Sequence, residues 1–419
     1  MGLEKERTQM SGEDGLAAVM GFTSFGAPRR ATRRSQAGRR RRRHRVLPQV
    51  LPGTELHGKV SLARTEEGPS GLVWLVSTTT EHEEEEEDEG NEAARHNVPY
   101  ARVMAELLAV KRQFAHVAPS SFAAARAATN PFERLGRARF VSRAALKLVA
   151  LDHICHVTRP RATALSSTFT FVDLCGGPGG FSEYLVWKTR RRGVRGYGIT
   201  LRDAANACDW RLPRPVHNVV TLSYGHDGTG NLDSVANRQS FCHLVRQHHA
   251  HGVDLVVADG GCAHARAHVD QERSMMRLVL AEVLTMFHVL GADGDFVCKT
   301  FELTTRASLE LCWLVHACFG RMALVKPITS RPASSERYLV ARGLRATSPL
   351  IPTAIHVLQA RLDQRPTDNM WHVPMLPPTT RMRHDADFHA YMTAANEAIA
   401  RTQLDACKRI LDYVKRKKR

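Results

Sequence analysis

The sequence predicts an α/β fold in which a doubly wound, mostly parallel sheet is flanked by N- and C-terminal helices. Strand-like apolar runs alternate with helix-like runs between about residue 168 and residue 341. The strand predicted at 168–174 ends in a glycine-rich turn that leads directly into a helix. Charged residues stand at the ends of later strands, where ligands bind in open sheets of this kind.

The alternation can be followed element by element. The predicted strands are 168–174, 196–201, 217–222, 253–259, 294–299, 322–327 and 338–341, and the predicted helices between them are 181–188, 271–290 and 308–319. Helical periodicity also occurs around 103–114 and over 141–156, ahead of the first strand. After about residue 345 the chain is Pro-rich in places and then predicts one or two helices between 388 and 414, followed by a frayed basic tail, 415–419.

This pattern divides the 419 residues into three regions. Residues 1–95 are expected to be mostly disordered, because the charge blocks Arg39–Arg43 and Glu83–Glu89 repel themselves and cannot form a core. A short apolar run at 71–76 could add a strand. Residues 100–345 are predicted to form the α/β domain, and 346–419 a C-terminal helical extension with a basic tail.

The composition indicates a polyanionic partner. The 59 Lys and Arg residues outnumber the 42 Asp and Glu residues, the formal charge is +17 and the pI is about 9.9, so RNA or DNA is the leading candidate. The Arg39–Arg43 run fits either a solvated tail or a nuclear-localisation or RNA-contact segment, and a nuclear location is the expectation. No apolar run of about 18 residues predicts a membrane span.

The cysteine and histidine patterns do not predict a metal site. The nine cysteines occur singly, which suits free thiols in a reducing compartment. His243, His248, His249 and His251 lie close together, but they lack paired cysteines or an H-E-x-x-H arrangement. We therefore expect them in a solvated loop.

The glycine-rich turn has the features of a cofactor site. Asp173 stands near the end of the preceding strand, and the turn continues through Gly176–Gly180. Glycine lacks a Cβ atom, so the chain can turn sharply and a ligand can lie against the backbone. The turn has neither the ending of a phosphate loop nor the spacing of a dinucleotide site. A carboxylate beside such a turn suits a ligand with a cationic amino-acid end and an adenosine end, such as S-adenosylmethionine.

Four charged residues occur where charge is otherwise unfavourable. Lys147 lies within an apolar helix, Asp259 and Lys299 end predicted strands, and Glu336 directly precedes the strand region at 338–341. Each alone fits a salt bridge or a residue facing water. Together with the glycine turn they predict a partly buried cluster, in which a lysine could act as a general base.

These residues carry a resemblance to a known family. The order of the K-D-K-E tetrad of FtsJ/RrmJ-like RNA ribose 2′-O-methyltransferases is matched by Lys147, Asp259, Lys299 and Glu336. The short segments around these residues, S-R-A-A-L-K, A-D-G-G and C-K-T-F, also resemble that family. Within that family the chain is most similar to the eukaryotic cap-specific mRNA enzymes. The resemblance implies a Rossmann-like S-adenosylmethionine-dependent methyltransferase that modifies the ribose 2′-hydroxyl of the first transcribed nucleotide of m7G-capped mRNA, with Lys299 as the base.

The resemblance also implies binding residues and partners, and no metal. The implied cofactor ligands are Ser142, Cys175, Gly176, Gly177, Pro178, Gly179, Gly180, Phe181 and Asn231. Relatives carry an aspartate at the place of Asn231, and Asp227 is the alternative ligand there. The implied RNA contacts are Lys111, Arg126, Val269, Asp270, Gln271 and Ser334. The implied partners are m7G-capped RNA and the transcription or capping machinery.

Two other functions stay open on the sequence. One keeps the chemistry but places the methyl group on another RNA position, namely the second cap nucleotide, ribosomal RNA or transfer RNA. The other is a non-catalytic cap- or RNA-binding subunit, which would have no need of four facing charges.

Overall fold

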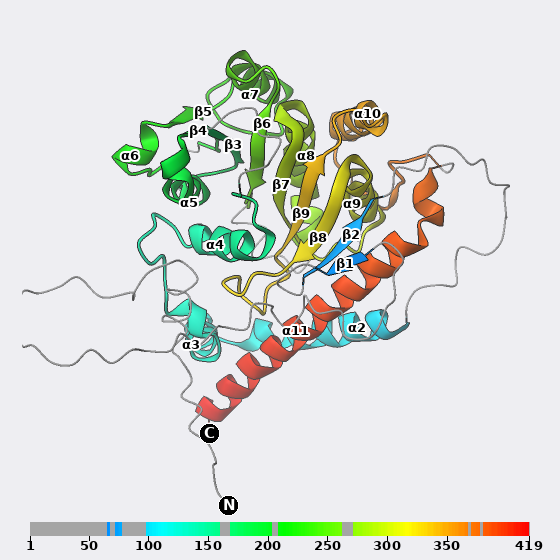
Figure 1. Ribbon diagram of the computed structural model, residues 1–419. Coiled ribbons are helices and arrows are strands. Elements are labelled where there is room, and N and C mark those ends of the chain that lie inside the picture. The colour runs from blue at the N-terminus through cyan, green and yellow to red at the C-terminus, as the bar shows by residue number, and fades with distance from the viewer. Residues whose placement is uncertain are drawn as a thin grey trace, which may run out of the picture.

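The computed structural model describes residues 65–67, 72–77, 98–159, 168–202, 208–261, 271–367, 370–377 and 380–418. Within these ranges the chain forms a nine-stranded mixed sheet in the order β1-β2-β8-β9-β7-β6-β3-β4-β5, with helices on both faces (Figure 1). Most of the N-terminal region predicted to be disordered lies outside the described residues. No helix in the described ranges has the length and hydropathy needed to cross a membrane.

The strands are β1 (Thr65–Glu67), β2 (Val73–Val76), β3 (Phe169–Leu174), β4 (Val194–Ile199), β5 (Val220–Ser223), β6 (Val253–Ala258), β7 (Leu290–Thr300), β8 (Phe319–Val325) and β9 (Arg337–Leu344). The α-helices are α2 (Val98–Gln113), α3 (Pro119–Thr129), α4 (Ala144–Cys155), α5 (Gly180–Thr189), α6 (Arg214–His217), α7 (Val235–His248), α8 (Gln271–Val289), α9 (Arg306–Cys318), α10 (Leu350–Asp363) and α11 (Ala386–Lys418). Short 3-10 turns include η2 (Pro131–Glu133) and η3 (Arg190–Arg192).

The topology of the sheet positions the site. Strands β5, β4, β3, β6 and β7 pair in parallel, and the chain runs outward from β3 in one direction before crossing to β6 on its other side. This reversal opens a crevice at the carboxyl ends of β3 and β6. Strand β9 lies between β7 and β8 and is antiparallel to both, so the residues before β9 reach the same rim. The predicted fold class is confirmed.

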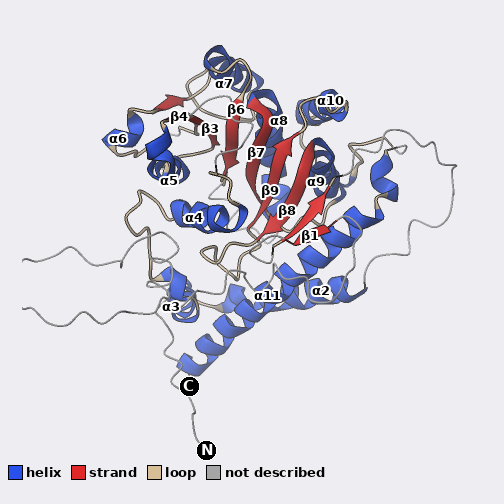
Figure 2. Ribbon diagram, viewed as in Figure 1, coloured by secondary structure: helices blue, strands red, loops and turns tan. Residues whose placement is uncertain are grey.

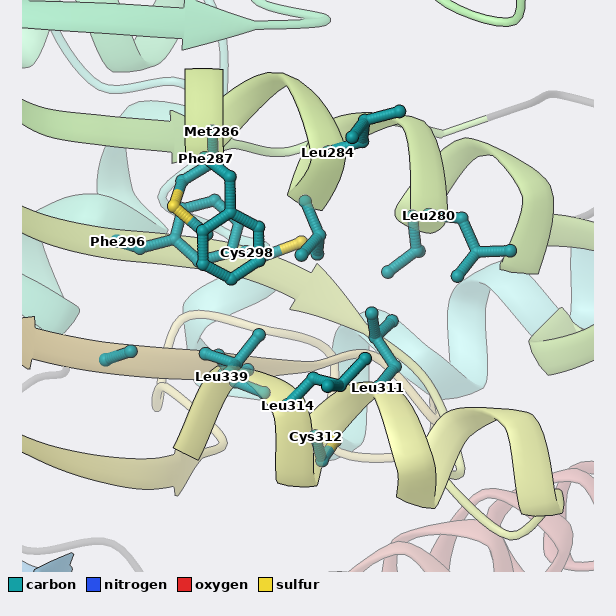
Figure 3. Close-up of a cluster of buried hydrophobic side chains, with 14 of the residues drawn as sticks. Leu280, Leu284, Met286, Phe287, Phe296, Cys298, Leu311, Cys312, Leu314 and Leu339 are labelled. Carbon is teal, nitrogen blue, oxygen red and sulfur yellow. The ribbon is translucent and has the colours of Figure 1, made fainter. Parts of the chain in front are cut away.

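Both faces of the sheet are buried, which explains the continuous apolar runs in its central strands. Side chains alternate along β7: Phe296 and Cys298 face α8 and α9, whereas Val297 belongs to the cluster beneath α4 and α5. Figure 3 shows the first of these layers, where Leu284 and Phe287 of α8 and Leu311 of α9 meet strand residues. Figure 2 shows the helices in blue on either side of the sheet, whose strands are red.

Of the one or two helices predicted between 388 and 414, the structure has a single long one. The helix α11 spans 33 residues and packs against α2 and α3 (Figure 1). It is tied to the sheet by Tyr391, whose hydroxyl accepts a hydrogen bond from the Leu324 amide at 3.0 Å. The expectation that 415–419 frays is wrong for residues 415–418, which belong to the helix, because Ile410 and Val414 are buried against the α3 region.

The histidine-rich segment also differs from the prediction. His243 and His248 lie within α7 and not in a loop. Ser234 caps this helix by accepting a hydrogen bond from the Asn237 amide, and Phe241 and Val245 supply its buried face. The run of polar residues from Asn237 to Ser240, directly ahead of Phe241, obscures the helical period in the sequence. Across the described ranges, no three His, Cys, Asp or Glu side chains are grouped so as to hold a metal ion.

Candidate active site

The four charged residues predicted from the sequence meet at the rim of the sheet. The Lys147 ammonium lies 2.9 Å from Glu336 Oε2 and 3.3 Å from Asp259 Oδ2. Lys299 Nζ lies 3.2 Å from Asp259 Oδ1 and donates a hydrogen bond to the Asp259 carbonyl oxygen at 2.8 Å. Elements far apart in the chain, α4, β6, β7 and the loop before β9, therefore supply one cluster of two ammonium and two carboxylate groups.

The cluster fixes the charge of two of its members. Burial opposes the charge of Lys147, but Asp259 and Glu336 outweigh it and raise the pKa of Lys147 above its usual value. Burial likewise opposes the charge of Glu336, yet the nearby ammonium groups of Lys147, Lys299 and Lys326 hold the Glu336 pKa well below its usual range. Lys147 is thus a fixed cation, whereas Lys299, among the residues that the structure describes, contacts one carboxylate oxygen and one carbonyl of Asp259.

Two further residues of the cluster were not predicted as site residues. Lys326 is buried and donates hydrogen bonds to the carbonyl oxygens of Ser334 at 2.7 Å and Glu336 at 2.5 Å, and burial lowers its pKa to about 7. Tyr338, the register partner of Lys299 on β9, donates a hydrogen bond to Asp259 Oδ1 at 2.6 Å. A charge directly after the apolar strand β8 is the signal that could have identified Lys326.

A buried carboxyl group lies behind the cluster. Glu282 of α8 is 1% exposed and accepts hydrogen bonds from the Gly260 amide at 3.2 Å and the Cys298 thiol at 3.6 Å. Burial raises the pKa of Glu282 to about 7, although the nearby Lys299 ammonium opposes that change. The side chain supports the turn that carries Asp259.

Replacing Glu282 with glutamine is expected to change how stability depends on pH. Because the Glu282 pKa is about 7 in the folded state and 4.5 ordinarily, the folded chain keeps a proton that the unfolded chain releases between these values. The free energy of unfolding of the native protein therefore falls by about 3 kcal/mol as pH rises through this window. Glu282→Gln removes that loss. The unfolding free energy of the variant minus that of the native protein should therefore rise by the same amount as the pH rises through this window. Chemical denaturation of both proteins near pH 4.5 and near pH 8 measures this difference in unfolding free energy. The same difference at both pH values would contradict the prediction.

The glycine turn forms a cradle between β3 and α5. Asp173 accepts hydrogen bonds from the Ser182 amide at 3.0 Å and the Ser182 hydroxyl at 2.7 Å, both through Oδ2. Its other oxygen, Oδ1, is buried without a hydrogen-bond partner, and burial raises the Asp173 pKa to about 7. The Ser142 hydroxyl, on the other side of the turn, is also buried and unpartnered, and a Cβ atom on Gly180 would collide with it.

Close packing explains the glycines of the turn. The Gly177 amide donates a hydrogen bond to Thr200 Oγ1 at 3.1 Å, and a Cβ atom on Gly177 would overlap the Cys208 carbonyl oxygen. A Cβ atom on Gly176 would lie 2.5 Å from the indole of Trp210. Trp210 was not predicted as a site residue. Its position depends on the 208–212 segment folding back over the turn, where the Arg211 amide donates to the Pro178 carbonyl at 3.0 Å.

The predicted cofactor residues have different surroundings. The side chains of Phe181 and Cys175 point away from the turn: Phe181 packs in the core beside Tyr338, and Cys175 lies near Glu282. Asn231 is exposed in a loop next to the end of β4, and its side-chain oxygen accepts a hydrogen bond from the Asp233 amide at 3.0 Å. The carboxylate of Asp227 also accepts hydrogen bonds within this loop, from the amide and the hydroxyl of Thr229.

The predicted RNA-contact residues lie around the cluster. Lys111 of α2 forms an ion pair with Glu302 at 3.4 Å, and Arg126 of α3 forms one with Glu133 at 2.9 Å. Gln271 accepts a hydrogen bond from the Ser335 hydroxyl at 2.8 Å, directly beside Glu336. The remaining predicted contacts are Ser334, whose hydroxyl donates to the Arg331 carbonyl at 2.8 Å, and Val269 and Asp270, which lie outside the described residues.

The orphaned oxygens of Asp173 and Ser142 fit S-adenosylmethionine. They offer one carboxylate and one hydroxyl on either side of a turn whose backbone a ligand can approach closely. A parallel sheet with this cradle at its switch point and a lysine–carboxylate cluster beside it defines the class of Rossmann-like methyltransferases. Residues 140–344 match the FtsJ-like methyltransferase family, and this part of the chain is an FtsJ-like methyltransferase domain.

The chain is also similar to individual relatives that carry the name cap-specific mRNA (nucleoside-2′-O-)-methyltransferase 1. The Xenopus laevis protein is 31% identical over 326 residues, covering 74% of this chain and 38% of its own length. The Dictyostelium discoideum protein is 32% identical over 71% of this chain and 41% of its own. The Homo sapiens protein is 32% identical over 69% of this chain and 36% of its own. The chain thus spans about two fifths of the length of these relatives.

Proposed function

We propose that the protein transfers a methyl group from S-adenosylmethionine to the ribose 2′-hydroxyl of the first transcribed nucleotide of m7G-capped mRNA. The observation that carries this proposal is the convergence of Lys147, Asp259, Lys299 and Glu336 beside the glycine cradle. The similarity to cap-specific relatives supports the choice of substrate.

The cofactor site consists mainly of backbone. Gly176–Gly180 would let the ligand approach the main chain, and Asp173 Oδ1 and Ser142 Oγ would each gain the hydrogen-bond partner that they lack. Asn231 would approach the adenosine end from the loop beside β4. When bound, S-adenosylmethionine supplies a methyl group on a positively charged sulfur, which needs no metal for activation.

Lys299 is the proposed proton acceptor for the 2′-hydroxyl. A base must be uncharged when it accepts a proton, and the raised pKa of Lys147 disqualifies that lysine. Lys299 is oriented by the carbonyl and one carboxylate oxygen of Asp259, which leaves part of its hydrogen-bonding capacity for the substrate. The Lys147 cation, held by Glu336, is placed to stabilise negative charge that develops on the ribose oxygen.

The RNA end is proposed to lie over the rim between α2, α3 and the 329–336 loop. Lys111 and Arg126 would exchange their carboxylate partners Glu302 and Glu133 for phosphate or cap groups. Gln271 and Ser334, together with the neighbouring residues 269–270, would border the reacting nucleotide. The proposal for a nuclear location rests on the Arg39–Arg43 run, and imaging of a fluorescent fusion of the full chain tests it.

The deciding experiment maps the methyl group by mass on defined RNA. The full chain is incubated with S-adenosylmethionine and an m7G-capped oligonucleotide, an uncapped one of the same sequence, and ribosomal and transfer RNA. Methylation of the first nucleotide of the capped RNA is expected. Transfer only to the second nucleotide or to uncapped RNA would reassign the substrate, and no transfer to any RNA would favour a binding subunit.

A further inference from the structure

Exposed arginines gather on the outer side of α5, in a surface that the catalytic proposal does not use. This α5 basic surface consists of the exposed residues Arg137, Arg139, Arg190 and Arg191. Arg139 and Arg190 lie over the ring of Trp187 of α5, and Arg137 lies near Glu183 of the same helix. Arg137 and Arg139 belong to the segment between η2 and α4, and the other two belong to η3, at the end of α5. Among the residues that the structure describes, no carboxylate forms an ion pair with Arg137, Arg190 or Arg191.

Aromatic side chains hold the two segments together. Phe140 packs edge-on against Trp187 of α5, with ring centroids 6.4 Å apart, and the Val141 amide donates a hydrogen bond to Glu183. The guanidinium groups of Arg139 and Arg190 lie 5.7 and 5.4 Å from the Trp187 ring centroid. Guanidinium groups that already stack on a ring lose less conformational freedom when they bind a phosphate.

The surface is continuous with the catalytic cluster. Glu336 accepts a hydrogen bond from Ser330 at 2.7 Å, and the next residue, Arg331, pairs with Glu133 at 3.0 Å. Glu133 also pairs with Arg126 and Arg143, so three arginines share one carboxylate immediately before Arg134. Along the other side, α5 starts at the glycine turn and its ten residues extend about 15 Å to η3. Positive charge is therefore found both beside the site and at the far end of α5.

We propose that the α5 basic surface binds the phosphate backbone of the RNA that follows the methylated nucleotide. This inference rests on the proposed function, because it assumes that the RNA end lies at the Lys299 cluster. Arginines near the site, at Arg331 and Arg143, and others beside the end of α5, at Arg139 and Arg190, suit a flexible single strand, whose phosphates can follow the protein surface without base readout. The surface would add affinity for long RNA without touching the reacting groups.

The test compares two double variants of the full chain with equal loss of charge. Arg137→Ala with Arg191→Ala removes two arginines of the surface. The control, Arg195→Ala with Arg365→Ala, removes two exposed arginines elsewhere, one near His249 on the opposite face of the sheet and one after α10. KM and kcat are measured on m7G-capped oligonucleotides of about 4 and about 20 nucleotides, and RNA binding by fluorescence anisotropy at several salt concentrations.

The surface variant is expected to raise KM for the long RNA roughly tenfold, leaving kcat and the KM for the short RNA unchanged. The slope of log affinity against log salt for the long RNA should fall by about 1.4, since each lost phosphate contact on a single strand contributes about 0.7. The control variant should match the native protein. An equal KM for both lengths in the native protein, or an unchanged slope in the surface variant, would assign the surface to another partner, such as an acidic protein. Absence of methyl transfer by the native protein would instead refute the proposed function.

Discussion

Replacing Lys299 with alanine is expected to lower the rate of methyl transfer to capped RNA by at least about 10²-fold, the usual contribution of a positioned base. Binding of S-adenosylmethionine should change little, because the cradle is formed by the β3–α5 turn and not by β7. Single-turnover transfer of a labelled methyl group measures the first quantity, and calorimetric titration with the cofactor the second.

A second variant separates the base from the charge. Lys299→Arg places a permanent cation beside Asp259, because a guanidinium group does not release its proton in the working range of pH. It should be as inactive as the alanine variant while retaining more of the native stability. Lys408→Ala, on the exposed side of α11, is the matched control and should retain full activity. Activity of Lys299→Arg near the native level would refute the assignment of the base.

Replacing Gly177 with alanine is expected to abolish measurable cofactor binding and to lower the free energy of unfolding by about 1–3 kcal/mol. The added methyl group would overlap the Cys208 carbonyl oxygen and lie 2.7 Å from Thr200 Oγ1, so the turn and the 208–212 segment would have to separate. Separation also breaks the hydrogen bond from the Gly177 amide to Thr200. Cofactor titration and chemical denaturation measure the two effects.

Gly320→Ala on β8 is the control for this variant. There the added methyl group would meet its nearest atoms, the carbonyl oxygens of Arg342 and Gly343, at the ordinary distances of 3.4 and 3.7 Å. Cofactor binding and stability should stay close to native. If Gly177→Ala behaved like Gly320→Ala, the turn could not be the rigid cradle described above.

The sequence predicted the central sheet well because burial on both faces produces continuous apolar strands. The strands from β3 to β9 lie within a few residues of their predicted ranges. The same logic identified Asp259 and Lys299, since a charge that ends a buried strand must reach the rim. The helix α7, by contrast, depends on tertiary contacts and on a single capping hydrogen bond.

Buried polar groups were the part of the site that the sequence concealed. Glu282 lies in the middle of an ordinary amphipathic helix, and only the fold reveals that Gly260 and Cys298 face it. Lys326 was visible as a charge after a strand, but its burial depends on the 334–336 segment folding over it. The place of Trp210 beside the glycine turn could not be predicted from the sequence, because its neighbours in sequence form no helix or strand.

The insertion of β9 between β7 and β8 has a consequence for protein synthesis. The residues of the cradle, from Ser142 to Thr200, leave the ribosome well before Glu336. Strand β7 must wait for β9 to gain its second neighbour, and Lys147 must wait for Glu336 to gain its closest partner. A nascent chain could therefore assemble a place for the methyl donor early, but it would become able to act on RNA only after nearly the whole domain has been translated.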